Sequence, residues 1–296
     1  MVSNLLKGYR AGFVPACAHP LLPSSFPAAF LCLLCCWATA CISQVEVLPN
    51  AHAHHDYQHH RPLFEALTHG FTCIEADIHL VGGELYTGHL FPQLSARRTL
   101  RRLYLEPLHR RLQQNGGRVY PNYAGVVYLM IDIKTDAEST FALLREQLLG
   151  FPQFCNNPYL RVFISGNRAI QQILNDTACV VGVDGRLADL GRGCDPEQMP
   201  VISDHFKKNF DWRGHGPMPA EEFARLQALA EEAHRQGKKL RFWATPDEPL
   251  VWGTLLEAGV DLINTDDLEG LHQFLTRRKI ASSPAPTSLN SSGVAR

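Results

Sequence analysis

Acidic residues alternate with apolar ones in two segments that have the pattern of buried strands. Glu75 and Asp77 lie two residues apart in the first segment, and Asp132 and Lys134 lie two apart in the second. Side chains two apart on a strand share a side, so the acids require a cation, a basic partner or a shared proton. Three carboxylates suit a hard cation, and we predict that Glu75, Asp77 and Asp132 bind Mg²⁺ or Ca²⁺. An ion-paired structural cluster around Lys134 is the alternative.

Histidine is concentrated in one short part of the chain. Residues 50–60 hold five of the 14 histidines, and His89 closes the strand and turn after the second strand-like segment. Imidazole titrates near neutral pH, so two histidines beside a metal-bound phosphate would supply a general base and a general acid. A hydrogen-bonded loop residue is the alternative for any single histidine.

Short apolar, β-branched segments alternate with helical patterns, as in repeated βα units on a parallel sheet. The predicted strands are 45–51, 72–79, 126–134, 161–165, 178–183, 200–203, 240–244 and 261–265, with an extended piece at 84–87. The predicted helices are 62–68, 96–114, 137–149, 168–175, 220–236, 248–258 and 268–278. Eight strands in a chain of this length fit a single-domain (β/α)₈ TIM barrel with parallel strands better than an open doubly wound sheet.

The barrel predicts that polar residues at the carboxyl ends of the strands converge on one site. Those residues are His52, His54, Asp56, Glu75, Asp77, Asp132, Lys134, Ser165, Asn167, Asp184, Ser203, Asp204, His205, Trp243, Asn264 and Asp266. Among them we predict Trp243, Asn264, His52 and Asp56 as substrate-binding residues. A packed core indole is the alternative for Trp243.

The motifs together resemble the PLC-like phosphodiesterase superfamily, which includes glycerophosphodiester phosphodiesterases and sphingomyelinase D enzymes. The resemblance rests on His54, Glu75-x-Asp77, His89, Asp132-x-Lys134 and Trp243, in that order along the chain. Within the superfamily, residues 53–57, 62–70 and 260–266 are similar to the altered inheritance of mitochondria protein 6 group and its bacterial relatives.

The resemblance implies a metal-dependent phosphoric diester hydrolase acting on a glycerophosphodiester or a phospholipid-headgroup type of substrate. It implies one divalent cation on the three acids, His54 and His89 as the acid–base or nucleophilic pair, Lys134 on the phosphate and Trp243 at the pocket wall. The sequence departs from glycerophosphodiesterases in two respects: His55 replaces the Arg that follows the first histidine, and the Pro-Glu-Asn-Thr motif is missing.

Two other functions are compatible with the same residues. His52 and His54 could form the metal pair of an amidohydrolase-type zinc hydrolase, with His205 and Asp266 as further ligands. That interpretation leaves the acids at 75, 77 and 132 without roles. A non-catalytic phosphodiester-binding barrel is the third hypothesis, and it predicts binding without turnover.

The two ends of the chain differ from its middle in composition. No Lys, Arg, Asp or Glu lies between Arg10 and Glu46, and a short apolar stretch ends at the small residues 38–40. This pattern predicts a signal peptide at 1–43, with a lipoprotein signal or an uncleaved anchor as alternatives. We therefore expect an exported protein with a barrel domain at 44–281. The Ser- and Pro-rich residues 282–296 predict a disordered tail.

Charge and cysteine content limit the partners. With 28 Lys and Arg against 29 Asp and Glu, the chain lacks the basic excess of a nucleic-acid binder. The six arginines of the predicted helix at 96–114 suggest peripheral membrane contact, with a solvated helix face as the alternative. The nine cysteines do not predict a disulfide framework, and Cys73 and Cys179 are interpreted as buried thiols.

Overall fold

The computed structural model describes residues 45–282. The predicted signal peptide at 1–43 lies outside these residues, as does all of the predicted tail except Ser282. The strands are β1 (Leu48–Ala53), β2 (Phe71–Val81), β3 (Glu84–Thr87), β4 (Val127–Ile133), β5 (Leu160–Gly166), β6 (Gly182–Gly185), β7 (Val201–His205), β8 (Lys239–Trp243) and β9 (Ile263–Thr265).

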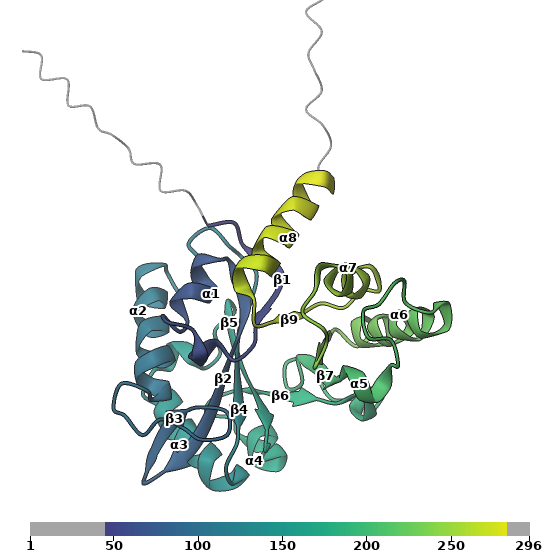
Figure 1. The fold of residues 1–296 in the computed structure, drawn as a ribbon. Helices are drawn as coiled ribbons and strands as arrows, with labels where there is room; N and C mark the ends of the chain where they lie inside the picture. The colour runs from purple at the N-terminus through teal and green to yellow at the C-terminus, as the bar shows by residue number, and fades with distance from the viewer. Residues whose placement is uncertain (1–44, 283–296) are drawn as a thin grey trace, which may run out of the picture. The chain divides into compact units, whose positions relative to one another are not determined.

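Eight of these strands form a parallel barrel (Figure 1). The order of pairing is β8-β7-β6-β5-β4-β2-β1-β9, and all of these pairs are parallel. A parallel bridge from Arg241 in β8 to Leu262, just before β9, joins the two ends of the sheet. β3 pairs antiparallel with the end of β2 and lies off this path. The fold is therefore the predicted (β/α)₈ barrel.

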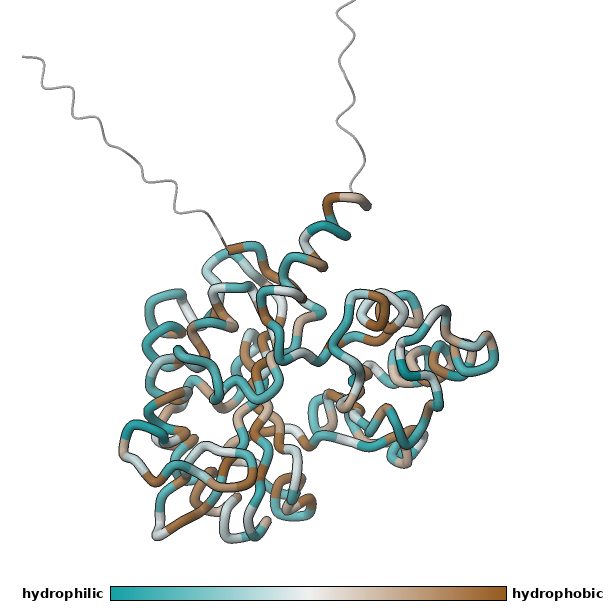
Figure 2. The backbone as a smooth tube through the Cα atoms, in the orientation of Figure 1, coloured by the Kyte–Doolittle hydropathy of each residue, from teal (hydrophilic) through white to brown (hydrophobic). Residues whose placement is uncertain are grey.

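Helices connect successive strands of the barrel. They are α1 (Phe64–Thr68), α2 (Glu106–Gln114), α3 (Ala137–Leu149), α4 (Ile170–Asn175), α5 (Phe206–Asn209), α6 (Ala220–Arg235), α7 (Pro249–Glu257) and α8 (Leu268–Ser282). In Figure 2, polar and apolar residues alternate along α2 and α6, because each helix turns one face to the strands. On α6 the buried face consists of Leu226, Ala230 and Ala233. None of the helices in residues 45–282 is long and apolar enough to cross a bilayer.

Local signals account for the elements whose bounds were predicted well. α3 begins where the Asp136 side chain accepts a hydrogen bond from the Ser139 N–H, so its first turn is capped.

The predicted helix at 96–114 begins later, as a π-helical turn at Arg101–Leu105 that leads into α2. The reason is pairing with β3: Thr99 bridges Tyr86, and the Thr87 N–H donates to the Arg98 carbonyl.

A disulfide joins Cys155 to Cys179 and corrects the sequence interpretation of these cysteines. Cys155 follows α3, whereas Cys179 precedes β6, and packing brings their Cα atoms within 4.7 Å. Cys179 was predicted to be a buried thiol because it lies in an apolar segment, but the spacing of the two residues in the sequence does not reveal their contact in space. Cys73 is a buried free thiol, as predicted.

Candidate active site

A pocket of about 400 Å³ opens at the carboxyl ends of the strands. Its walls include His54, Glu75, His89, Asp132, Lys134, Ser165, Arg186, Arg241 and Trp243. A larger hollow of about 830 Å³ lies at the start of β1 and beside α8, but neither histidine nor cysteine lines it. The smaller pocket therefore holds the chemistry, and six of the predicted site residues meet there.

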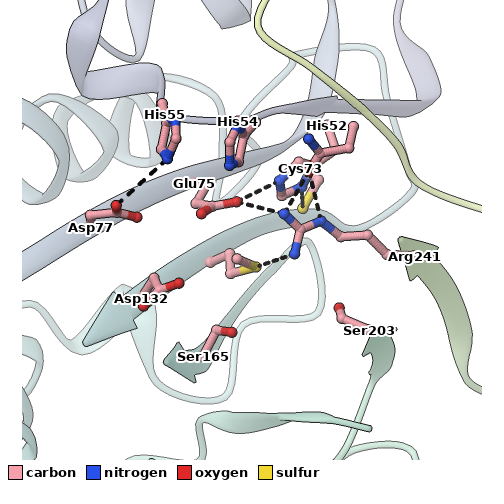
Figure 3. Close-up of polar contacts among 12 residues, drawn as sticks. His52, His54, His55, Cys73, Glu75, Asp77, Asp132, Ser165, Ser203 and Arg241 are labelled. Atoms are coloured by element: carbon pink, nitrogen blue, oxygen red, sulfur yellow. Dashed lines mark hydrogen bonds and ion pairs between the residues drawn. The ribbon is translucent and has the colours of Figure 1, made fainter. Parts of the chain in front are cut away.

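Three carboxylates from two neighbouring strands form what we call the acid cluster: Glu75, Asp77 and Asp132. Glu75 and Asp77 lie on the same side of β2, and the register of β2 with β4 places Asp77 directly opposite Asp132. One oxygen from each residue lies within 4.8 Å of the others. The sequence pattern and the strand pairing together thus produce the predicted convergence (Figure 3).

Two oxygens of the acid cluster lack a hydrogen-bond donor. The Oδ1 atoms of Asp77 and Asp132 are buried without a hydrogen-bond partner. Lys134 Nζ lies 3.2 Å from Asp77 and 3.0 Å from Asp132, so one ammonium serves both carboxylates. Burial and the charge of Glu75 raise the pKa of Asp77 and raise the pKa of Asp132 to about 7. Buried oxygens without partners and raised pKa values fit a site built to hold a divalent cation.

Glu75 is held differently from the two aspartates. Its Oε2 atom accepts hydrogen bonds from Arg241 Nη2 at 2.7 Å and from His52 Nε2 at 2.9 Å. Burial alone would raise the pKa of Glu75, but the Arg241 charge and the His52 hydrogen bond hold it well below its usual range. Glu75 is therefore a fixed anion at the floor of the pocket, with Arg241 reaching it from the opposite side (Figure 3).

Two pocket histidines are each oriented by a carboxylate. His54 Nδ1 lies 2.9 Å from Asp266 Oδ1, and His89 Nδ1 lies 2.9 Å from Asp77 Oδ2. When Nδ1 is committed to a carboxylate, the Nε2 atom is the one left to exchange protons with a ligand. Burial by itself lowers the pKa of His54, but the hydrogen bond with Asp266 and the charge of Glu75 raise it overall. The hydrogen bond with Asp266 therefore favours the protonated form of His54.

His55 is a pocket residue outside the predicted site set. It has a left-handed backbone conformation, with φ of 47°, and its ring contacts the rings of His54 and His89. The ring centroids are 3.5 Å from His54 and 4.7 Å from His89. Burial and the neighbouring His54 lower the pKa of His55 to about 4, so it is a neutral wall of the pocket. Its place in the histidine-rich segment was the available signal.

Arg241 is the second residue missed by sequence reasoning. It is buried in the centre of the barrel, where its Nε and Nη2 atoms donate to Asn264 Oδ1 at 3.1 and 2.6 Å. The sequence contained a signal for it, because Arg241 alternates with apolar residues in β8 and shares a side with Trp243.

Three predicted substrate-binding residues lie behind the pocket wall, which corrects their assignment. Asp56 is fully buried and accepts hydrogen bonds from the Leu63 N–H and the Tyr104 hydroxyl. His52 is fully buried between Glu75 and Cys73, and burial with the Arg241 charge lowers its pKa to about 3. The Asn264 amide oxygen accepts hydrogen bonds from Arg241. These side chains support the site and do not face a ligand.

The geometry also weighs against the zinc pair considered from the sequence. Within residues 45–282, no group of side chains able to hold a metal includes His52 or His205. Asp266 approaches His54 and His55, and a second such group joins His55, Asp77 and His89. The all-carboxylate group is the one that matches a hard cation.

Comparison with known families places the fold and the site in a class. The model of the AIM6-like phosphodiesterase domain matches residues 42–180, which carry the acid cluster and both oriented histidines. The model of the glycerophosphoryl diester phosphodiesterase family matches residues 239–269, which carry Arg241 and Trp243. The chain is thus a barrel of the PLC-like phosphodiesterase superfamily.

Full-length relatives identify the family within that class. Altered inheritance of mitochondria protein 6 of Kluyveromyces lactis is 32% identical over 319 residues, covering 78% of this chain and 73% of the relative. The protein of the same name from Eremothecium gossypii is 28% identical, covering 78% of this chain and 70% of the relative. The chain belongs to the altered inheritance of mitochondria protein 6 family.

Solved structures give a weaker similarity. A glycerophosphodiester phosphodiesterase from Parabacteroides distasonis aligns with a TM-score of 0.49 and 15% identity, covering 78% of this chain and 98% of the other. One from Agrobacterium tumefaciens aligns with a TM-score of 0.43 and 16% identity, covering 76% of this chain and 100% of the other.

Proposed function

We propose that this chain hydrolyses phosphodiesters with the help of one divalent cation, Mg²⁺ or Ca²⁺. The acid cluster carries the proposal, because two of its buried oxygens have no partner and a single lysine serves two of its carboxylates. Glu75, Asp77 and Asp132 would hold the cation. When bound, it would neutralise charge on a non-bridging oxygen of the diester. The family match to a phosphodiesterase domain supports the same reaction class.

The chain's own residues supply the proton transfers. His54, whose pKa is raised by its hydrogen bond with Asp266, delivers a proton to the departing alkoxide, while His89, oriented by Asp77, takes a proton from the attacking water. Lys134 binds a phosphate oxygen, since its ammonium reaches the rim of the acid cluster and lines the pocket. Trp243 forms the side wall that limits the headgroup.

A lipid-headgroup or glycerophosphodiester substrate agrees with the surface beside the pocket. The loop after β3 begins at His89 and exposes Leu90, Phe91 and Leu94, whose exposed fractions are 72%, 89% and 63%. Apolar side chains this exposed beside a catalytic residue favour contact with a membrane surface. The next part of the chain adds the exposed Arg101 and Arg102, two positive charges that share the single acidic partner Glu106 and would attract anionic lipid.

Export is part of the proposal. The predicted signal segment lies outside the described residues, but the Cys155–Cys179 disulfide supports an oxidising compartment. Disulfides persist in exported proteins and are rare where thiols are kept reduced.

Replacement of His89 tests the proposed hydrolysis. With Mg²⁺ present, His89→Gln is expected to lower the rate of bis(p-nitrophenyl) phosphate hydrolysis by at least ~100-fold, because the general base is lost. His234→Gln is the matched control: both side chains are 46% exposed and each contacts an aspartate, but His234 lies on α6 and does not line the pocket. Binding of the diester without hydrolysis by the wild type would favour the non-catalytic hypothesis instead.

A further inference from the structure

A cationic group lines the pocket across β5 from the acid cluster. Arg186 follows β6 directly, lines the pocket and lies over the indole of Trp243, with 5.0 Å from its Cζ atom to the ring centroid. Neither the proposed proton transfers nor the acid cluster uses this residue. Its guanidinium therefore needs its own explanation.

The guanidinium is anchored through only one of its nitrogens. Arg186 Nη1 donates to Asp184 Oδ2 at 2.8 Å and to the Gly185 carbonyl at 2.9 Å. Within the described residues, no protein acceptor contacts its Nε or Nη2 atoms, and the side chain is 24% exposed. The remaining N–H groups are held in place and are available to a ligand in the pocket.

The buried acid beneath Arg186 is already fully occupied. Asp184 accepts hydrogen bonds from Ser165 Oγ at 2.7 Å and from Ser203 Oγ at 2.6 Å, in addition to the one from Arg186. Arg168 also donates to the main-chain carbonyl of Asp184, so a second guanidinium lies beside this residue. Both oxygens of the Asp184 side chain therefore have donors without the remaining N–H groups of Arg186.

We infer that Arg186 forms a subsite for a second negative charge on the substrate. This charge would lie on the headgroup alcohol that is esterified to the phosphate. The inference rests on the proposed function and narrows it. A guanidinium with free N–H groups and a plane fixed by an indole is suited to a carboxylate or a phosphate. A quaternary ammonium headgroup would find the face of Trp243 already covered by Arg186. The structure therefore assigns an anionic headgroup to this pocket.

Three soluble diesters that differ in headgroup charge test the subsite. They are glycerophosphocholine, glycerophosphoglycerol and glycerophosphoglycerol carrying a terminal phosphate. We expect kcat/KM of the wild type to rise in that order, with at least ~10-fold between the cationic and anionic diesters. Arg186→Gln is expected to reduce this ratio to within about 3-fold, whereas Arg186→Lys retains the order with a smaller ratio. The ratio does not depend on the folded fraction, so loss of stability cannot imitate the result.

Arg161→Gln is the matched control, because the Arg161 side chain is also 24% exposed and pairs with a glutamate, but it does not line this pocket. Dissociation constants for the three diesters, measured by calorimetry on His89→Gln with and without Arg186→Gln, give a readout that needs no turnover. Equal binding and turnover of all three diesters, or a ratio unchanged by Arg186→Gln, would overturn the subsite. Charge-selective binding by a wild type that hydrolyses none of them would support the subsite and overturn the proposed reaction.

Discussion

Asp184 and the acid cluster, which are buried in the same barrel, differ in how the oxygens of their carboxylates are paired. Asp184 has three side-chain donors, two from serines and one from Arg186. In the acid cluster Asp77 also has three side-chain donors, but all of them reach its Oδ2 atom: they come from Tyr57, His89 and Lys134. The Oδ1 atoms of Asp77 and Asp132 are left buried without a partner. A buried carboxylate costs free energy unless its oxygens are paired. The contrast separates an acid that the fold satisfies by itself from the acids for which we propose a bound cation.

Asp56 is an intermediate case that sharpens the contrast. Its Oδ2 atom accepts two hydrogen bonds, whereas its Oδ1 atom is buried without a partner. Within residues 45–282, it belongs to no group of side chains that could share a metal. Burial raises the pKa of Asp56 to about 7, which favours the protonated, uncharged carboxyl group. A bound proton thus neutralises Asp56, whereas we propose a cation for the acid cluster.

Removal of charge from the acid cluster is expected to have the largest effect. Asp77→Asn should lower kcat/KM on bis(p-nitrophenyl) phosphate by at least ~10³-fold, because it removes a cation ligand and the partner of His89. It should not lower the melting temperature measured without metal, since it relieves repulsion among like charges. Unaltered turnover by this variant would contradict the assignment of the cluster.

Cation binding should stabilise the folded protein through the same cluster. At a Mg²⁺ or Ca²⁺ concentration 100 times the dissociation constant, the free energy of unfolding should rise by about 2.7 kcal/mol. Asp132→Asn should remove most of this gain, because Asp132 supplies one of the unpartnered oxygens. Chemical denaturation with and without the metal measures the effect. An equal gain in the variant would place the cation elsewhere.

The satisfied acid should matter for stability more than for chemistry. Asp184→Asn is expected to lower the free energy of unfolding by about 2 kcal/mol, because the ion pair with Arg186 and the donors of two serines lose their charged acceptor. Urea denaturation measures this loss. A variant as stable as the wild type would show that the Asp184 network does not hold this side of the barrel together.

A pH dependence of stability is set by Asp56. An acid whose pKa is higher in the folded state contributes stability below its unfolded pKa and loses it as pH rises through the folded pKa. The free energy of unfolding of the wild type relative to Asp56→Asn should therefore fall by about 1 kcal/mol per pH unit between pH 4 and pH 7. Denaturation curves across this range provide the test, and a flat difference would mean that Asp56 stays ionised.

The parts of the fold and site that depend on local periodicity could be predicted from the sequence. Alternation along β2 placed Glu75 and Asp77 on the same side of the strand, and the pairing of β2 with β4 brought Asp132 beside them. Alternation in β8 would have revealed Arg241 in the same way. Most strand positions were predictable because those strands are short apolar segments. The strand predicted at 178–183 is an exception, because the structure places β6 at Gly182–Gly185, with Asp184 inside it.

The parts that depend on contacts distant in sequence were not predictable. Asp56 lies three residues beyond β1, where the chain turns in a 3₁₀ helix (Asp56–Gln58) and buries the carboxylate against Tyr104. A polar residue at a strand end can face either the pocket or the surrounding helices, and the sequence does not distinguish the two. The Cys155–Cys179 pair depends in the same way on a contact between residues 24 apart in the sequence, one just after the 3₁₀ turn Pro152–Phe154 and the other before β6.

The central claim is that the acid cluster holds the cation used for hydrolysis. Its most direct test is hydrolysis of bis(p-nitrophenyl) phosphate after chelation, with Mg²⁺, Ca²⁺ or Zn²⁺ added back separately. The account predicts that chelation abolishes turnover and that Mg²⁺ or Ca²⁺ restores it in the wild type but not in Asp77→Asn. Restoration by Zn²⁺ alone, or turnover that survives chelation, would contradict it.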